Sequence, residues 1–371
     1  MKKLPLLSVA ALTAVLSPSL FAAHTFTNDQ GDSLTIDGRF EARFRDNGDK
    51  PSTFDSGSSR LGFKGQMKLD SDWVGFGHAE WGYNSGDNGS NIYDRLLYVG
   101  VKHDKYGSIS VGTKQWAAFY DVAWFTDMGR VFGTRGSGVY NLEDWGIASG
   151  TGRAENSLVY RNSIGDDWSY GITLQASRQD VGLSGRNQEG EQPNRATATL
   201  DNGLGGSILY RGIEGVSVGL AYHQNEVNDL NMTVDGVENC DMMRILLIGA
   251  NYTGEHLYLG ATAHIGENWE SIETSSSTNS MIDTWGAEVY AYYHFDNGLR
   301  PTLNYNYFEN RDGDFDYTRH LVAPGLEYHF KRNTLLLWTE YQIDLGDDQL
   351  AAAGQYVNAE NQVAAGLRYY F

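Results

Sequence analysis

Two short runs of the sequence contain residue types that could do chemistry. The first, Gly215-Val216-Ser217-Val218-Gly219, spells the G-x-S-x-G pattern, in which a strained turn from a strand into a helix exposes a nucleophilic serine. Here the run lies inside an alternating segment that continues to Tyr222. We therefore interpret the match as chance, and the sequence also contains no H-E-x-x-H pattern of a metalloprotease.

The second run, Asp312-Gly313-Asp314-Phe315-Asp316, carries carboxylates of the kind that bind calcium. A calcium loop between two helices needs a longer series of ligands that ends in a glutamate, and this series is missing. We interpret the run as an acidic stretch on the outer surface of the protein. The sequence thus predicts no metal site and no cofactor.

A third kind of chemistry is electrostatic, and the segment from Leu34 to Arg45 shows it most clearly. One set of alternate residues is Leu34, Ile36, Gly38, Phe40, Ala42 and Phe44, and the other is Thr35, Asp37, Arg39, Glu41, Arg43 and Arg45. A period of two predicts a β-strand with an apolar face and a charged face. Soluble antiparallel sheets also alternate, but a face charged at nearly every position favours a strand that lines water.

The alternation repeats along the chain, and the connections alternate in length. Short connections lie around Ser71, Asp104, Asp166, Glu214, Gly254, Asn297 and Arg332. Longer polar loops lie near 46–58, 84–92, 117–151, 178–203, 225–242, 267–283, 310–318 and 344–360. Together they predict an all-β fold, a sixteen-stranded antiparallel transmembrane barrel. A barrel of this size keeps an aqueous channel, whereas a soluble propeller would repeat in fours.

Composition also favours a membrane barrel. The chain has 44 glycines, 23 tyrosines, 15 phenylalanines and 9 tryptophans, and its mean hydropathy is −0.43. No apolar run is long enough for a membrane helix, but a barrel exposes only alternate residues to lipid and so keeps a low mean hydropathy. The net charge of −19 argues against binding of nucleic acid. The single cysteine, Cys240, excludes an intramolecular disulfide.

The N-terminus predicts export. Lys2 and Lys3 precede an apolar run from Leu4 to Leu16, and small residues follow at Ala22 and Ala23. Because the run is too short to span a bilayer, we predict a cleaved signal peptide over residues 1–23. Residues 24–371 contain no linker and form a single barrel domain. Its longest loop, about 117–151, is expected to fold inward and narrow the channel.

Several stretches, in order from an early strand to the last, carry a family resemblance. They are Arg60-Leu61-Gly62-Phe63-Lys64-Gly65, Tyr120-Asp121, Thr126-Asp127-Met128, Phe132-Gly133, Gly152-Arg153, Tyr160-Arg161-Asn162, Gly298-Leu299-Arg300-Pro301 and Tyr370-Phe371. The chain resembles the general diffusion porins of Gram-negative outer membranes, a trimeric sixteen-stranded family. The resemblance implies an outer-membrane channel for passive diffusion of ions and small hydrophilic solutes, and no enzyme.

In that family, acids on the third long loop face a ladder of basic residues across the lumen. The positions that match the ladder are Arg39, Arg60, Arg95 and Arg153. The matching acids are Asp121 and Asp127 on the loop and Glu80 on the wall. Parity supports the assignment: Arg95 precedes the apolar Leu96 and Tyr98, so we expect these two side chains on the opposite face.

The loop tip departs from the family pattern. The family has Pro-Glu-Phe-Gly-Gly, whereas this chain has Arg130-Val131-Phe132-Gly133-Thr134. Val131 stands where the second loop carboxylate belongs, and Arg130 stands where the proline belongs. Glu143 and Asp144 could supply acid further along the loop. We therefore expect the cation preference of the family to be altered at this constriction.

The resemblance also implies partners. We expect a homotrimer whose first strands pack at the threefold axis and whose second long loop contacts a neighbour. Tyr369 and Phe371 resemble the terminal signal read by the outer-membrane insertion machinery, and the outer surface is expected to contact lipid and lipopolysaccharide. Three alternatives stay open: a sugar-specific channel with an aromatic slide near the long loop, a barrel enzyme, and a structural or adhesive barrel.

Overall fold

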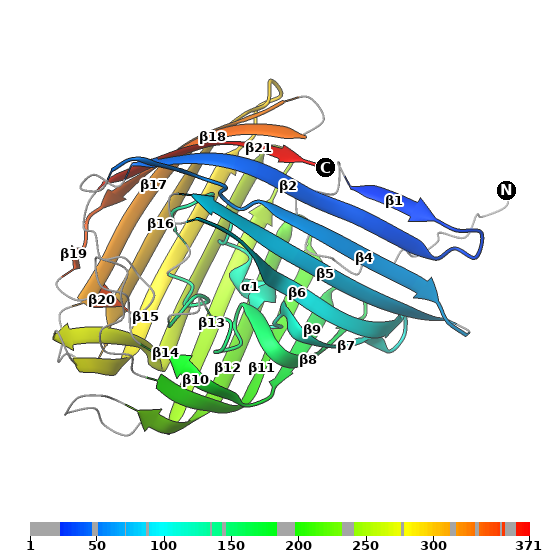
Figure 1. The fold of residues 1–371 in the computed structure, drawn as a ribbon, viewed down its shortest axis with the longest axis horizontal. Helices are drawn as coiled ribbons and strands as arrows, with labels where there is room; N and C mark the ends of the chain where they lie inside the picture. Colours follow the sequence, from blue (N-terminus) through cyan, green and yellow to red (C-terminus); the bar gives the residue numbers. More distant parts are fainter. Residues whose placement is uncertain are drawn as a thin grey trace.

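The computed structural model describes residues 23–46, 51–70, 72–86, 89–133, 136–142, 146–183, 197–231, 241–275, 278–311, 317–330, 334–348, 351–352 and 361–371. The structure is almost entirely β, with one short helix (Figure 1). The elements are β1 His24–Thr27, β2 Ser33–Asp46, β3 Thr53–Asp55, β4 Arg60–Lys68, β5 Trp73–Gly86, β6 Gly89–His103, β7 Gly107–Trp116, α1 Tyr120–Ala123, β8 Arg153–Ile164, β9 Trp168–Gln175, β10 Arg178–Gly182, β11 Thr197–Ile213, β12 Val216–Asn231, β13 Met242–Thr253, β14 Leu257–Ser275, β15 Thr278–Tyr293, β16 Leu299–Asn310, β17 Tyr317–His329, β18 Leu335–Asp344, β19 Asp347–Asp348, β20 Ala351–Ala352 and β21 Gln362–Tyr370. None of the described helices is long and apolar enough to cross a membrane.

Sixteen of the described strands form one closed antiparallel barrel. Each pairs with the next long strand along the chain, from β2 through β4–β9 and β11–β18 to β21. The ring closes because β21 pairs with β2 as well as with β18. The predicted fold class is thus confirmed, and closure leaves no sheet edge to be solvated in lipid.

The two faces of the wall follow the predicted alternation. On β2, Phe40 is 62% exposed on the outside of the barrel, whereas the next residue, Glu41, is buried inside. On β21, Leu367 and Tyr369 are exposed and the intervening Arg368 is buried. Apolar side chains therefore face the membrane while charged side chains of these strands face the lumen.

Several predicted loops are shorter than the sequence indicated. β14 runs to Ser275 and β15 begins at Thr278, so most of the predicted loop 267–283 is strand. In the same way, β5 and β6 reach residues 86 and 89. In the sequence, the residues of these extensions are mostly polar and follow no strict period of two. Backbone pairing continues there without the alternation that made the other strands visible in the sequence.

The predicted tight turns join the strands at their other ends. The described ones lie around Asp104, Asp166, Glu214, Gly254 and Asn297, whereas Ser71 and Arg332 lie outside the described residues. Gly298, in the Asp296-Asn297-Gly298 turn, has a φ of 89°. This left-handed conformation favours glycine and fits the hairpin signal in the sequence.

The long connection between β7 and β8 fills one side of the lumen. Its helix α1 contacts β11, β12 and β13 (Figure 1). Phe119, Val122 and Phe125 of this connection are buried in one apolar cluster with inward-facing side chains such as Leu209 and Ile245. On β11–β13 the inward residues thus differ from the charged face predicted for residues 34–45, because they form a packed core with the loop.

Candidate functional site

The four predicted ladder arginines lie in one row on the inner wall. They are Arg39 on β2, Arg60 on β4, Arg95 on β6 and Arg153 at the start of β8. Arg39 and Arg60 are direct partners in the strand register. Each guanidinium is near enough to the next one in the row to repel it, from Arg39 to Arg60, Arg95 and Arg153. The structure thus brings together four residues, of which the first and the last lie more than a hundred positions apart in the sequence.

Arg95 enters this row through a β-bulge. Glu80 pairs with Leu96 and Trp81 pairs with Asp94, so Arg95 is an extra residue between the two pairs. Leu96 is buried, the Tyr98 hydroxyl lies 3.2 Å from Nδ1 of His78, and Leu97 is 47% exposed. The expectation that Leu96 and Tyr98 face the membrane is therefore wrong. The bulge shifts the alternation by one residue and lets Arg95 and Leu96 both point inward.

Glu80 lies between two members of the row. Its carboxylate is 2.7 Å from Nε of Arg95 and 3.3 Å from Nε of Arg60. All three side chains are largely buried. One carboxylate thus holds two guanidinium groups in place. Its single negative charge neutralises only part of their positive charge.

Asp127 on the long loop faces the end of the row. It is partly buried, and Tyr120 and Tyr140 both donate hydroxyl hydrogen bonds to its Oδ2. Arg153 and Arg95 are close enough to interact with its charge. Burial raises the pKa of the Asp127 carboxyl, and the two tyrosine hydrogen bonds and the arginines oppose this rise.

Asp121 has a different partner from the row. Arg161 of β8 donates from Nε to Oδ2 at 3.0 Å and from Nη2 to Oδ1 at 3.1 Å. Arg161 also donates to the backbone oxygens of Trp116 and Ala117. This pair fastens the start of the inward loop to the wall, so the structure does not bring Asp121 together with the four arginines.

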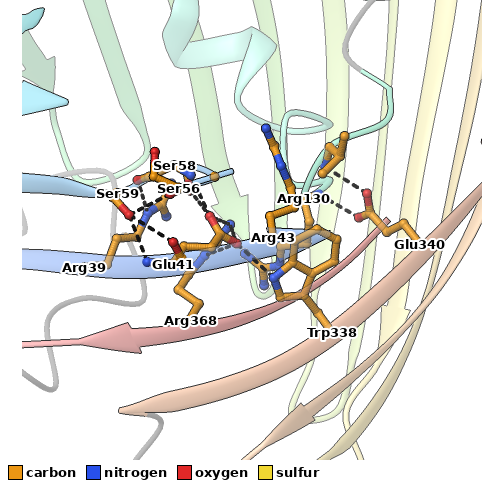
Figure 2. A network of polar contacts seen from close by, with 12 residues as sticks. Arg39, Glu41, Arg43, Ser56, Ser58, Ser59, Arg130, Trp338, Glu340 and Arg368 are labelled. Carbon is orange, nitrogen blue, oxygen red and sulfur yellow. Dashed lines mark hydrogen bonds and ion pairs between the residues drawn. The ribbon is translucent and has the colours of Figure 1, made fainter. Parts of the chain in front are cut away.

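The loop tip crosses the lumen to β17 and β18. The backbone N–H groups of Arg130, Val131 and Phe132 donate to the Glu340 carboxylate at 2.6, 2.8 and 3.2 Å (Figure 2). The Arg130 side chain lies 2.6 Å from the carboxylate of Glu327. Three N–H donors and one ion pair thus hold the tip against the far wall.

Val131 makes an apolar contact at the loop tip, where the family pattern has a carboxylate. Phe132 is buried in a second cluster with inward-facing residues of β17, β18 and β21, including Trp338 and Tyr370. Val131 packs against the same cluster. The side chain that replaces the expected loop carboxylate therefore anchors the tip instead of lining the lumen with negative charge.

Comparison with known proteins supports the same architecture. The sequence model of the Gram-negative porin family matches residues 30–371. Outer membrane porin F of Salmonella typhi is 30% identical, with 97% of this chain and 99% of that protein covered.

The chain belongs to the Gram-negative porin family.

Solved structures agree with this assignment. The porin resembles Salmonella typhi OmpF, solved as a complex with daunomycin, with a TM-score of 0.77 and 27% identity over 94% of this chain and all of that one. It also shares its fold with the trimer form of OmpT from Vibrio cholerae, with a TM-score of 0.64 and 17% identity over 92% of this chain and 99% of that one. The predictions of family, channel function and outer-membrane location are confirmed.

The charged cluster around Glu41 is among the features of the porin that the sequence analysis did not single out. Glu41 accepts from Nε and Nη2 of Arg368 at 3.0 and 3.1 Å and from Nε1 of Trp338 at 2.9 Å (Figure 2). Ser58 donates to the same carboxylate, and Arg39 donates to the backbone oxygen of Ser58. The inward parity of Glu41 and Arg368 was visible in the sequence, but their pairing depends on closure of the barrel.

The chain terminus lies at the same seam. Phe371 and Gly38 exchange backbone hydrogen bonds at 3.2 and 2.9 Å. The Phe371 ring lies 4.9 Å from that of Phe40, and Tyr369 is exposed on the outer face. The porin thus ends in an outward aromatic pair beside the first barrel strand.

Some predicted features lie outside the part of the chain that the structure describes. Residues 1–22, which hold nearly all of the predicted signal peptide, lie outside the described residues, as do Cys240, Glu143, Asp144 and the acidic run 312–316. Ser217 is described and lies within β12, with a strand and no helix after it. The porin therefore lacks the strand-to-helix turn that a nucleophile elbow needs at this position.

Proposed function

We propose that this porin is a general diffusion channel whose neck lies between Asp127 on the inward loop and the row Arg39, Arg60, Arg95 and Arg153. The observation that carries the proposal is the electrostatic proximity of Asp127 to Arg95 and Arg153. Opposed charges on two sides of a narrow, low-dielectric channel create a transverse field. Polar solutes align in this field, whereas an apolar solute must displace ordered water.

Conductance of the purified, detergent-extracted protein in a planar bilayer tests this function. We expect large steps whose current is linear in voltage, together with rapid swelling of protein-containing liposomes in small neutral sugars. A bilayer that stays silent while the protein is folded would contradict an open channel.

The aromatic residues of the loop argue against a sugar-specific channel. Phe119, Phe125 and Phe132 are at most 6% exposed, because they pack into the two apolar clusters. Trp116 stacks on Tyr120 with ring centroids 4.0 Å apart. These rings hold the loop on the wall and form no open slide. Current blocked by one sugar at low concentration would favour the specific channel instead.

We further propose a homotrimer that buries the outer face of the first strands. Gly65 of β4 and Gly77 of β5 are register partners on this face, and space beside Gly65 is open. Small residues allow two walls to approach closely. The mass of the detergent complex tests the proposal: Gly77→Arg should release monomers, and a wild-type monomer would contradict it.

The remaining proposals concern export and chemistry. Residues 1–23 are removed as a signal peptide, so N-terminal sequencing of the mature protein should begin at or next to His24. Tyr369 and Phe371 act as the recognition signal for the insertion machinery, and Phe371→Ala should lower the yield of folded protein in the membrane. The porin has no enzymatic activity in this proposal, which a lipid or peptide hydrolysis assay checks.

A further inference from the structure

The charged wall repeats one arrangement, in which a single carboxylate lies among two guanidinium groups. The groups are Glu80 with Arg60 and Arg95, Glu41 with Arg39 and Arg368, and Glu327 with Arg130 and Arg300. The Glu41 and Glu327 side chains are only 1% and 2% exposed, and that of Glu80 is 11% exposed. Because each group combines one negative charge with two positive charges, each keeps a net positive charge.

Arg153 adds to this excess. Within the described part of the chain it makes no ion pair, although Asp127 and Glu80 lie near it. The two other acids at the neck offset the excess only in part. Asp127 brings one negative charge to Arg153 and Arg95, and the Glu340 carboxylate is covered by three backbone N–H groups of the loop tip. The neck is therefore positive in a protein whose net charge is −19.

We propose that this neck is a path for small oxyanions of the phosphate and carboxylate class, which pass along the row of guanidinium groups. The proposal rests on the channel function above and adds its preferred solute. Guanidinium groups present planar, paired N–H donors that match the oxygens of these anions. Rows of arginine are also a recognised basis for anion preference in pores.

The shared carboxylates explain how such anions could leave again. A channel must attract a solute strongly enough to admit it and weakly enough to release it. Each carboxylate already occupies part of the hydrogen-bonding capacity of at least one of its arginines, as Glu80 does with Nε of Arg95. An entering anion therefore meets only the remaining charge and donors, and the next group in the row offers the same weak attraction.

Reversal potentials in a tenfold KCl gradient, followed by addition of inorganic phosphate, test the proposal. The wild-type protein should prefer chloride over potassium, and phosphate added at constant ionic strength should reduce the chloride current. Arg153→Gln should lower the chloride-to-potassium permeability ratio about sevenfold, because one charge about 7 Å away at the dielectric constant of water changes the population of each ion about 2.7-fold, in opposite directions for chloride and potassium. It should also weaken the block by phosphate. Because Arg153 makes no ion pair in the described structure, this variant leaves no buried carboxylate unpaired.

Two further variants make the test decisive. Glu80→Gln removes the negative member of one group and should raise the chloride preference by a similar factor. Arg244→Gln is the matched control, because Arg244 and Glu267 form an ion pair on the exposed surface with 47% exposure of each side chain. It should leave the reversal potential unchanged.

The outcomes separate the two proposals. A silent bilayer would contradict the channel function itself. Open channels with a wild-type preference for potassium, or with Arg153→Gln and Glu80→Gln shifted in the same direction, would overturn the anion path and leave the channel function intact. Block of the wild type and of Arg153→Gln by phosphate to an equal extent would also count against it.

Discussion

The two sides of this lumen are built from the same alternating strands but have opposite chemistry. On β11–β13 the inward residues include Leu209, Ala221 and Ile245, and the inward loop covers them as a packed core. On β2, β4, β6 and β21 the inward residues include arginines and glutamates held in ion pairs. The loop is thus positioned by hydrophobic burial on one side of the lumen, which leaves the other side as a charged wall beside water.

The loop tip joins these two regions. Phe132 continues the apolar packing at β18, while Arg130 and the tip N–H groups bond to Glu327 and Glu340. The width of the channel thus depends on both kinds of interaction at once. A substitution at Phe119 would weaken the apolar packing, and one at Glu340 would weaken the hydrogen bonds of the tip.

The largest effect is expected from the apolar side. Phe119 is fully buried against the wall, so Phe119→Ala should cost about 3–5 kcal/mol of loop docking through lost burial and a cavity. We expect single-channel conductance to rise and current noise to increase. Phe295→Ala, at a residue that is 45% exposed, is the matched control and should leave both unchanged. An unaltered conductance in Phe119→Ala would show that apolar packing does not hold the loop.

A smaller effect is expected at the tip. Glu340→Ala removes the acceptor of three backbone N–H groups. A hydrogen bond to a charged group contributes about 1.5–3 kcal/mol, but bonds from the freed N–H groups to water in the lumen offset much of the loss. The tip should detach intermittently while the rest of the loop stays docked, which gives brief additional conductance levels in single-channel records. Glu267→Ala, on the exposed surface, provides the comparison. Quiet records from Glu340→Ala would mean that Phe132 alone holds the tip.

The charge of Arg130 should have a weaker effect. Arg130→Gln leaves Glu327 with Arg300 and His329, so folding should be preserved. One lost charge at the neck should lower the chloride preference by a factor similar to that of Arg153→Gln. Arg130→Lys keeps the charge and should restore the reversal potential. If glutamine and lysine give the same value, the Arg130 charge does not act on permeating ions.

The smallest effect is a dependence on pH. Burial raises the pKa of Asp127 above its ordinary value of 3.8, so this carboxyl takes up a proton at a higher pH than a free aspartate does. Acidification should therefore remove the negative charge of the loop and increase the chloride preference. The step in reversal potential should disappear in Asp127→Asn. A step of equal size in that variant would assign the titration to another group.

Much of this architecture could be predicted from the sequence, because alternation and the spacing of turns are local. The strand around Arg39, the inward parity of Glu41 and the tight turn at Gly298 all follow from neighbouring residues. The barrel as a whole follows from their repetition.

Other features could not be predicted, because they depend on register and closure. The bulge at Arg95 is a one-residue mismatch between two strands, which no single-strand pattern reveals. The pair of Glu41 and Arg368 joins residues 327 positions apart in the sequence. The apolar character of the lumen on β11–β13 resembles that of a strand buried on both faces, and only the docked loop explains it.

The pairing of β2 with β21 also determines when the barrel wall closes during folding. The wall becomes continuous only when the last residues of the chain reach β2, where Glu41 meets Arg368 and Phe371 meets Gly38. A chain interrupted before this point can build fifteen of the sixteen strand positions and still be a curved sheet with two open edges. The synthesis of an intact C-terminus is thus a checkpoint: the Glu41–Arg368 pair, one part of the charged wall, forms only at the final step of barrel assembly.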